Sequence, residues 1–292
     1  MKVEITTSDG LKLCGQEWTP DAEVKAVVCL VHGLGEHCGR YEHVAETLNR
    51  HRIALVAFDL RGHGQSGGKR GHAPSYERLM SDIFQGLENA RKRYPNLPLF
   101  LYGHSLGGNL VIHYALQKHP DLTGVIASAP LLRLPFEPPA WKTGLLRRMY
   151  ALWPRLTLPS GLETAALSRD TGVVRAYRND PLVHDRISAR LGVDMLDAGE
   201  WNLEHAAEFP LPLLLMHSDT DRITCAQASR EFAKRAGQTC TLKVWEKLYH
   251  DLHQEAEQRE VLAVVLEWME QTATYSNVNS NSKGSSSPTG AP

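Results

Sequence analysis

Residues 98–108 read PLFLYGHSLGG, and this stretch decides the fold. A short apolar run ends in G-H-S-L-G, and a segment with helical spacing of its apolar residues follows at once. Gly103 and Gly107 leave room for a sharp turn between a strand and a helix, with the Ser105 hydroxyl pushed out at its apex. The N–H groups that open the helix favour a developing negative charge there. The stretch therefore predicts a nucleophile elbow.

Strands and helices alternate along the chain on both sides of this elbow. Ala26–Val31, Ile53–Phe58 and Gly124–Ala127 are short apolar runs, which are typical of strands buried on both faces. Helical spacing is found at Tyr41–Arg50 and Tyr76–Arg93. Further on, two strands and two helices are expected at Leu211–His217, Gln227–Arg235, Thr241–Trp245 and Gln254–Gln271. This alternation predicts an α/β fold with a mainly parallel sheet covered on both faces.

The alternation starts after a predicted hairpin at residues 2–18 and is interrupted once, after Pro130. We interpret residues 131–207 as a helical cap inserted between a first part of the core, residues 1–130, and a second part, residues 208–272. Residues 273–292 are rich in Ser, Asn and Gly with little apolar content, which predicts a disordered tail.

Within the predicted cap, apolar residues recur at helical spacing between Trp141 and Trp153, interrupted by Arg147 and Arg148. Two interpretations remain open for this helix. It can pack on the sheet below, or it can dock on a membrane surface and admit lipid.

Composition limits the classes of function. Hydrophobic residues make up 42% of the 292 residues and charged residues 22%, as in ordinary globular proteins. The formal net charge is −1 and no long basic block occurs, so nucleic acid is not an expected partner. The five cysteines are scattered, which predicts reduced thiols and no metal site. Cys225, shortly after the candidate acids, can be an inert small residue or a sensitive thiol.

The first ten residues lack the apolar core of a signal peptide, and no 18-residue apolar run occurs. We therefore expect a cytoplasmic protein that meets membranes, if at all, only at their surface. The oligomeric state does not follow from the sequence.

A serine nucleophile needs a base and an acid, which in sheets of this kind come from loops after later strands. Asp219 and Asp221 follow one such strand, and His250 and His253 follow the next, in the required order. Spacing alone does not separate the two members of either pair. For the oxyanion, the N–H of Leu106 is one expected donor, and the loop after the first buried strand supplies Leu34 as the other.

Several strings of residues resemble one known family. HGLGEHCGRY at 32–41, GHGQS at 62–66 and GHSLGG at 103–108 are similar to the motifs of the monoacylglycerol lipases, within the α/β-hydrolase superfamily. The resemblance continues through LSR at 167–169, YRNDPL at 177–182, SDTDR at 218–222 and YHDLH at 249–253. It extends to about residue 272 and departs from the family mostly in the cap and the last helix.

The resemblance implies an α/β-hydrolase fold with a helical cap and a serine ester hydrolase without cofactor or metal. It implies Ser105 as the nucleophile, Asp221 as the acid and His250 as the base, with Leu34 and Leu106 as oxyanion donors.

The same resemblance implies that Glu36, Arg40, Tyr177 and His253 line a polar pocket for a glycerol head group. Glu36 and Arg40, four residues apart, can equally form an ion pair that orders their loop. The expected substrate is a single-chain monoacylglycerol. Lysophospholipids, thioesters, short esters or peptides are alternatives, as is a non-catalytic binding protein of the same fold.

Overall fold

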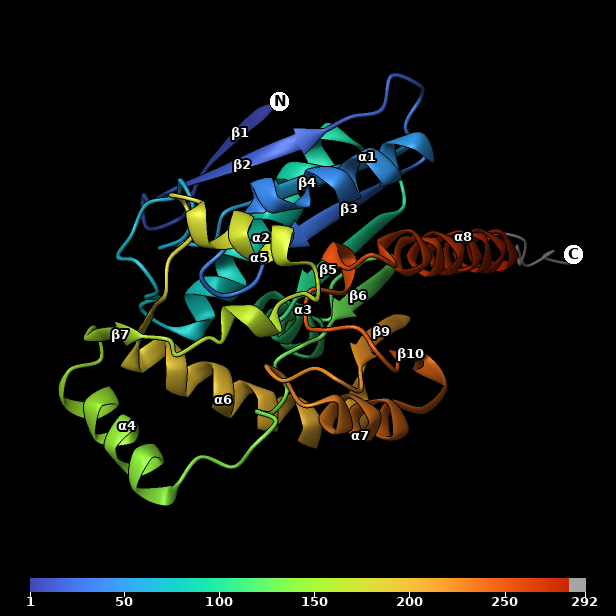
Figure 1. Cartoon of the computed structure of the whole chain (residues 1–292). Coiled ribbons are helices and arrows are strands. Elements are labelled where there is room, and N and C mark those ends of the chain that lie inside the picture. Colours follow the sequence, from blue (N-terminus) through green and yellow to red (C-terminus); the bar gives the residue numbers. More distant parts are fainter. Residues whose placement is uncertain (284–292) are drawn as a thin grey trace, which may run out of the picture.

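The computed structural model of the chain describes the backbone of residues 1–283 and the side chains of residues 1–274 (Figure 1). In this part of the chain an eight-stranded sheet has the order β1-β2-β4-β3-β5-β6-β9-β10. Its strands are Lys2–Thr6 (β1), Lys12–Trp18 (β2), Ala26–Val31 (β3), Ile53–Phe58 (β4), Leu99–His104 (β5), Gly124–Ser128 (β6), Leu213–Ser218 (β9) and Cys240–Trp245 (β10).

The first two strands form the antiparallel hairpin that the sequence predicts, and β2 pairs antiparallel with β4. From β4 to β10 every neighbouring pair is parallel. The strand order reverses at β3, which has β4 on one side and β5 on the other. In such sheets the crevice beyond the carboxyl ends of the strands at the reversal is where ligands bind. The loop after β3 and the elbow after β5 meet at this crevice.

Strand β3 shows why its sequence is apolar throughout. Val27, Cys29 and Val31 pack into one core, while Val28 and Leu30 pack into a second core on the opposite face. The first core includes residues of α2 (Tyr76–Arg93), α3 (Leu106–Lys118) and α7 (Ala226–Ala236). The second includes residues of α1 (Glu42–Arg50) and α8 (Gln258–Lys283). Helices therefore cover both faces, as predicted.

Between β6 and β9 the chain leaves the sheet and forms the cap. Its helices are α4 (Ala140–Leu152), α5 (Thr171–Asn179) and α6 (Ala189–Glu204). It also contains a small antiparallel sheet of β7 (Thr157–Pro159) and β8 (Arg186–Ser188), which the apolar pattern did not reveal. Helix α6 packs on α3 and α7 of the core, and α4 packs on α6 (Figure 1).

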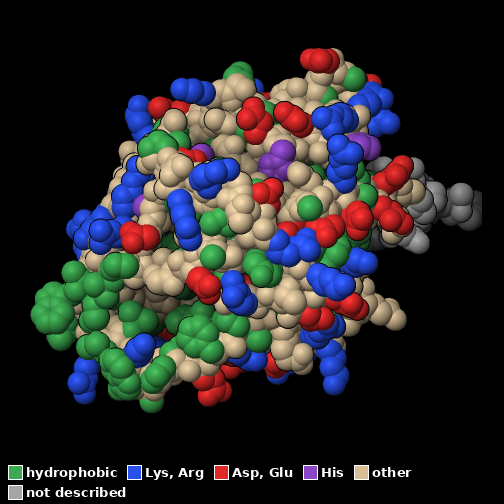
Figure 2. Space-filling model, in the orientation of Figure 1, with side chains coloured by type: hydrophobic (Ala, Val, Ile, Leu, Met, Phe, Trp, Pro, Cys, Tyr) green, Lys and Arg blue, Asp and Glu red, His purple; other side chains and the backbone are tan. Residues whose placement is uncertain are grey.

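Helix α4 buries none of its residues, so the interpretation in which it packs on the sheet is wrong. Hydrophobic side chains instead gather on the surface around α4 (Figure 2). We call this surface the apolar face of the cap; its exposed members are Phe136, Trp141, Leu145, Leu152, Trp153, Leu156 and Leu158. Within the described residues, no helix has the length and apolar content needed to cross a membrane.

The last helix is longer than the sequence suggests. The disordered tail is predicted from residue 273, but α8 continues to Lys283. Residues 284–292, the rest of the predicted tail, lie outside the described residues.

Candidate active site

Ser105 lies between β5 and α3 with φ 55° and ψ −115°, a conformation that non-glycine residues rarely adopt. A Cβ on Gly107 would lie 2.0 Å from the carbonyl oxygen of Val31, and a Cβ on Gly103 would lie 2.2 Å from that of Gly107. Glycine at both positions therefore lets the strand and the helix approach closely enough to form the turn. The Ser105 N–H donates to the carbonyl of Ser128 on β6 at 2.9 Å, which holds the strained residue in place.

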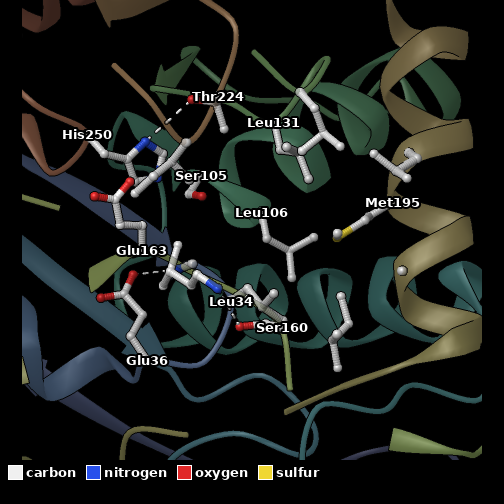
Figure 3. Close-up of a pocket in the computed structure, with 18 of the residues that line it drawn as sticks. Leu34, Glu36, Ser105, Leu106, Leu131, Ser160, Glu163, Met195, Thr224 and His250 are labelled. Carbon is white, nitrogen blue, oxygen red and sulfur yellow. Dashed lines mark hydrogen bonds between the residues drawn. The ribbon is translucent and has the colours of Figure 1, made fainter. Parts of the chain in front are cut away.

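The structure brings one member of each candidate pair together. His250 Nδ1 lies 2.8 Å from Asp221 Oδ2, and both side chains are buried. Asp219 lies on the surface, where both of its carboxylate oxygens accept from Arg230 at 2.7 Å. His250 lines the same cavity as Ser105, and its ring lies beside that residue (Figure 3).

The protonation of this pair follows from its contacts. Burial raises the pKa of Asp221, but the charge of His250 and hydrogen bonds from His217 and His250 outweigh burial and hold the pKa well below its ordinary value. Because Asp221 is then a carboxylate that only accepts, Nδ1 of His250 carries the proton and donates it. Nε2 of His250 is left unprotonated and able to take a proton from a hydroxyl in the cavity.

Asp221 is held by contacts that sequence analysis missed. Its Oδ1 accepts from the N–H groups of Ile223 at 2.7 Å and Thr224 at 3.0 Å. Its Oδ2 accepts from the hydroxyl of Thr224 at 2.8 Å and lies 3.2 Å from Nε2 of His217. The Asp-x-x-Thr spacing at 221–224 is the available sequence signal, because an Asp side chain bonds the backbone two residues on in a turn.

The loop after β3 lies against the serine. A Cβ on Gly33 would lie 3.3 Å from that of Ser105, and both Leu34 and Leu106 line the cavity (Figure 3). The N–H of Gly33 already donates to Glu36 Oε1 at 2.6 Å. The N–H of Leu34 is therefore the next donor in this loop that can serve the cavity.

Glu36 orders this loop and reaches the cavity wall as well. Besides Gly33, it accepts from the Tyr41 hydroxyl at 2.8 Å and from Nε of Arg40 at 3.1 Å. Burial raises the pKa of Glu36, but the charges of Arg40 and the nearby histidines outweigh burial and lower it to about 2. The Arg40 guanidinium also lies over the ring of Tyr177, 4.7 Å from its centroid. The ion pair considered from the sequence is thus formed, and it is buried.

The four expected head-group residues differ in their access to the cavity. Glu36 and Tyr177 line it, whereas the side chains of Arg40 and His253 are buried and do not line it. The ring of His253 stacks on Tyr41 and meets the edge of His104. His253 therefore faces neither Asp221 nor the space beside Ser105.

The cavity has a volume of about 520 Å³ and is lined by both polar and apolar residues. Ser105, His250, Glu36 and Tyr177 supply polar groups. Further polar residues, including Ser160, Glu163 and Thr224, also line the cavity. Much of the rest of the wall is apolar and comes mainly from the cap and the segments beside it; its members include Leu131, Leu134, Leu146, Ile187, Met195 and Leu196. Such a cavity fits a molecule with one apolar chain and a small polar head.

One cluster in the described part of the chain has the residue types of a metal site. The ligand atoms of His104, His250 and Asp251 lie within 4.8 Å of one another. Two of the three groups already bond each other, since His104 Nε2 lies 3.0 Å from Asp251 Oδ1. His250 is likewise bonded to Asp221. These hydrogen bonds account for the cluster.

A largely parallel sheet with a serine elbow after β5, an acid after β9 and a histidine after β10 defines the α/β-hydrolase class. The chain belongs to the Hydrolase_4 family, described as "Serine aminopeptidase, S33", whose model matches residues 22–257, and within it to the monoacylglycerol lipases. The resemblance seen in the motifs is thereby confirmed.

Three similar proteins illustrate this family. The monoacylglycerol lipase of Mycolicibacterium smegmatis is 33% identical over 89% of this chain and 93% of its own length. The crystal structure of the Paleococcus ferrophilus monoacylglycerol lipase has a TM-score of 0.82 and 35% identity, covering 89% of this chain and 99% of that one. An uncharacterized abhydrolase domain-containing protein of Dictyostelium discoideum is 39% identical over 91% of this chain, which spans 28% of that longer protein.

Proposed function

We propose that this protein is a serine carboxylester hydrolase that cleaves monoacylglycerols to a fatty acid and glycerol. The observation that carries the proposal is the Asp221–His250 pair beside Ser105, in a cavity that both polar and apolar residues line (Figure 3). The names of the similar monoacylglycerol lipases from Mycolicibacterium smegmatis and Paleococcus ferrophilus support the substrate class.

Acylation starts when Ser105 Oγ attacks the ester carbonyl while Nε2 of His250 takes the hydroxyl proton. Asp221 holds Nδ1–H and stabilises the imidazolium that forms. The N–H groups of Leu34 and Leu106 donate to the developing oxyanion; the loss of one such donor typically costs about 10²–10³ in rate. The tetrahedral intermediate collapses, the C–O bond to glycerol breaks, and His250 gives its proton to the leaving oxygen.

Deacylation repeats these steps with water. His250 takes a proton from the water that attacks the acyl carbonyl, and the second intermediate releases the fatty acid as Ser105 Oγ regains a proton from His250. The apolar part of the cavity holds the acyl chain throughout, and Glu36 and Tyr177 face the glycerol hydroxyls.

The test of the reaction is labelling by a fluorophosphonate probe together with hydrolysis of monoacylglycerol. The wild type should be labelled and Ser105→Ala should not. An unlabelled wild type would favour a non-catalytic binding protein. Lysophospholipid hydrolysed faster than monoacylglycerol, at equal acyl chain, would replace the proposed substrate by the alternative.

We further propose that the apolar face of the cap rests on a lipid surface from which substrate enters. Trp141 and Trp153 are each more than 60% exposed. Lys142 lies over the ring of Trp141, and Arg148 is exposed on the same helix. In co-sedimentation with vesicles of phosphatidylcholine and phosphatidylglycerol, the double change Trp141→Ser and Trp153→Ser should release the protein. Phe84→Ser, which removes an exposed aromatic ring from α2, should leave binding unchanged.

A further inference from the structure

Asp251 is a buried carboxylate next to the proposed base, and the mechanism above does not use it. Its side chain is 5% exposed, and its Oδ1 lies 3.0 Å from Nε2 of His104. Its Oδ2 lies 3.5 Å from Nη2 of Arg40. A buried carboxylate is costly unless it is paired, so these two contacts offset the cost of burying Asp251 there.

The contacts of Asp251 join parts of the site that are distant in sequence. His104 is the residue immediately before Ser105, at the end of β5. Arg40 belongs to the 3₁₀ turn Cys38–Tyr41, where it also holds Glu36. The side chain of Asp251 thus links the loop of the base to the elbow and to the loop after β3.

The backbone of the same residue links this loop to the cap. The N–H of Asp251 donates to the carbonyl of Leu167 at 2.8 Å, and the N–H of His250 lies 3.4 Å from the carbonyl of Ala166. The orientation of His250 therefore depends on contacts that converge on its neighbour, because neither His250 nor Asp251 lies in a helix or strand.

The charge of Asp251 acts on the base directly. Burial lowers the pKa of His250, but Asp221 outweighs burial, and Asp251 and Glu36 add to the same upward shift. The ionisable groups around His250 are Asp221 from the loop after β9, His104 from β5 with ring centroids 4.8 Å apart, Asp251 from its own loop, and Glu36 from the loop after β3. His253, from the 3₁₀ turn Leu252–Gln254, also interacts electrostatically with His250. Arg40 offsets part of the negative charge, since it is paired with both Glu36 and Asp251.

We propose that Asp251 is a positioning residue for this hydrolase. Through its contacts with His104 and Arg40 it holds the loop of His250 in a fixed position relative to the Ser105 elbow. Its charge stabilises the imidazolium of His250 that forms at each proton transfer. The inference rests on the proposed serine hydrolase function.

The test is the pH dependence of kcat/KM and of fluorophosphonate labelling for Asp251→Asn, which keeps the shape and removes the charge. We expect kcat at the pH optimum to fall about tenfold with KM within about twofold, since an imidazolium loses one opposite charge nearby. The acid limb of both profiles should move to lower pH, because His250 then loses its proton more readily. Asp251→Glu should keep the limb of the wild type, since it retains the charge.

Asp219→Asn is the matched control, because it removes a carboxylate that lies on the surface and faces Arg230. It should leave both the rate and the profile unchanged. A profile of Asp251→Asn that superimposes on the wild type would overturn the inference, even if the variant is less stable. If Asp251→Asn does not fold, an acid limb of Asp251→Glu displaced to lower pH would overturn it instead.

The labelling experiment separates this inference from the proposed function. A wild type that is not labelled refutes both. A labelled wild type with an unchanged profile in Asp251→Asn refutes only the role of Asp251.

Discussion

Replacing Glu36 by glutamine removes one charge from the centre of the site and should destabilise the protein markedly. Glutamine can still accept the hydrogen bonds of Gly33 and Tyr41 through its side-chain oxygen. It cannot neutralise Arg40, whose side chain is 7% exposed and is then left with Asp251 as its partner. The change therefore tests the contribution of the buried ion pair to stability while the hydrogen bonds that shape the loop are kept.

The pKa of Glu36 gives the size of the expected loss in the free energy of unfolding. Folding lowers this pKa from 4.5 to about 2, so its contribution to stability is complete above pH 4.5 and is lost as pH falls toward 2. At about 1.4 kcal/mol per pKa unit, the charged form contributes about 3 kcal/mol at pH 7 and about 1 kcal/mol at pH 3. Breaking a buried pair by removing one partner typically costs 3–5 kcal/mol, roughly the same amount.

Urea unfolding of wild type and Glu36→Gln at pH 7 and pH 3 measures both values. We expect the difference in the free energy of unfolding to be about 3 kcal/mol at pH 7 and to shrink by about 2 kcal/mol at pH 3. Glu46→Gln is the matched control, because Glu46 and Arg50 have the same four-residue spacing but are more than half exposed. That change should cost less than about 0.5 kcal/mol. A Glu36→Gln difference below about 1 kcal/mol at pH 7, or one independent of pH, would refute the reasoning.

Three further predictions concern the triad and the elbow. Thr224→Val removes the hydroxyl that donates to Asp221 at 2.8 Å. In steady-state kinetics kcat should fall about tenfold while KM stays nearly unchanged. An unaltered kcat would contradict the role of Thr224 in holding Asp221. His250 must be neutral to act as the base, and Asp221 raises its pKa above 6.5. The acid limb of kcat/KM should therefore have its midpoint above pH 6.5, and activity should be lost as pH falls through that midpoint. A midpoint below about pH 6 would argue against His250 as the base. Gly107→Ala places a Cβ 2.0 Å from the Val31 carbonyl oxygen and should abolish activity or soluble expression. Gly144→Ala is the contrasting variant, because it lies on exposed α4 and its Cβ would have nothing within 4 Å. It should stabilise the protein by about 0.5–1 kcal/mol in thermal unfolding.

Much of the sheet could be predicted because its strands are short apolar runs with buried neighbours on both faces. The bounds expected for β3 and β4, Ala26–Val31 and Ile53–Phe58, are those observed. The sequence predicts an end of the last helix at Gln271, earlier than the observed end at Lys283, because a polar segment rich in Ser and Asn has no apolar period to mark a helix. The β7–β8 pair was missed because three-residue strands are too short to show alternation.

Helix α4 of the cap shows that a local pattern of apolar residues does not identify what the helix packs against. An apolar face at helical spacing predicts burial against something, but it does not say whether the partner is protein or lipid. Trp141 and Leu152 are exposed because α4 lies beyond α6, which covers the core in its place (Figure 1).

The sequence by itself determined the elbow, the alternation of strands and helices, and the order in which serine, acid and histidine follow their strands. These are local properties, set by glycine at tight approaches and by the period of apolar residues. Spacing along the chain left Asp219 and Asp221 open, and the family resemblance implied Asp221. The tertiary structure adds the contacts, with Asp221 bonded to His250 and His253 stacked on Tyr41. The contacts of Asp251 with His104 and Arg40 are seen only in the tertiary structure. Such choices depend on which side chains several loops bring to one edge of the sheet, and spacing along the chain carries no information about distances between loops.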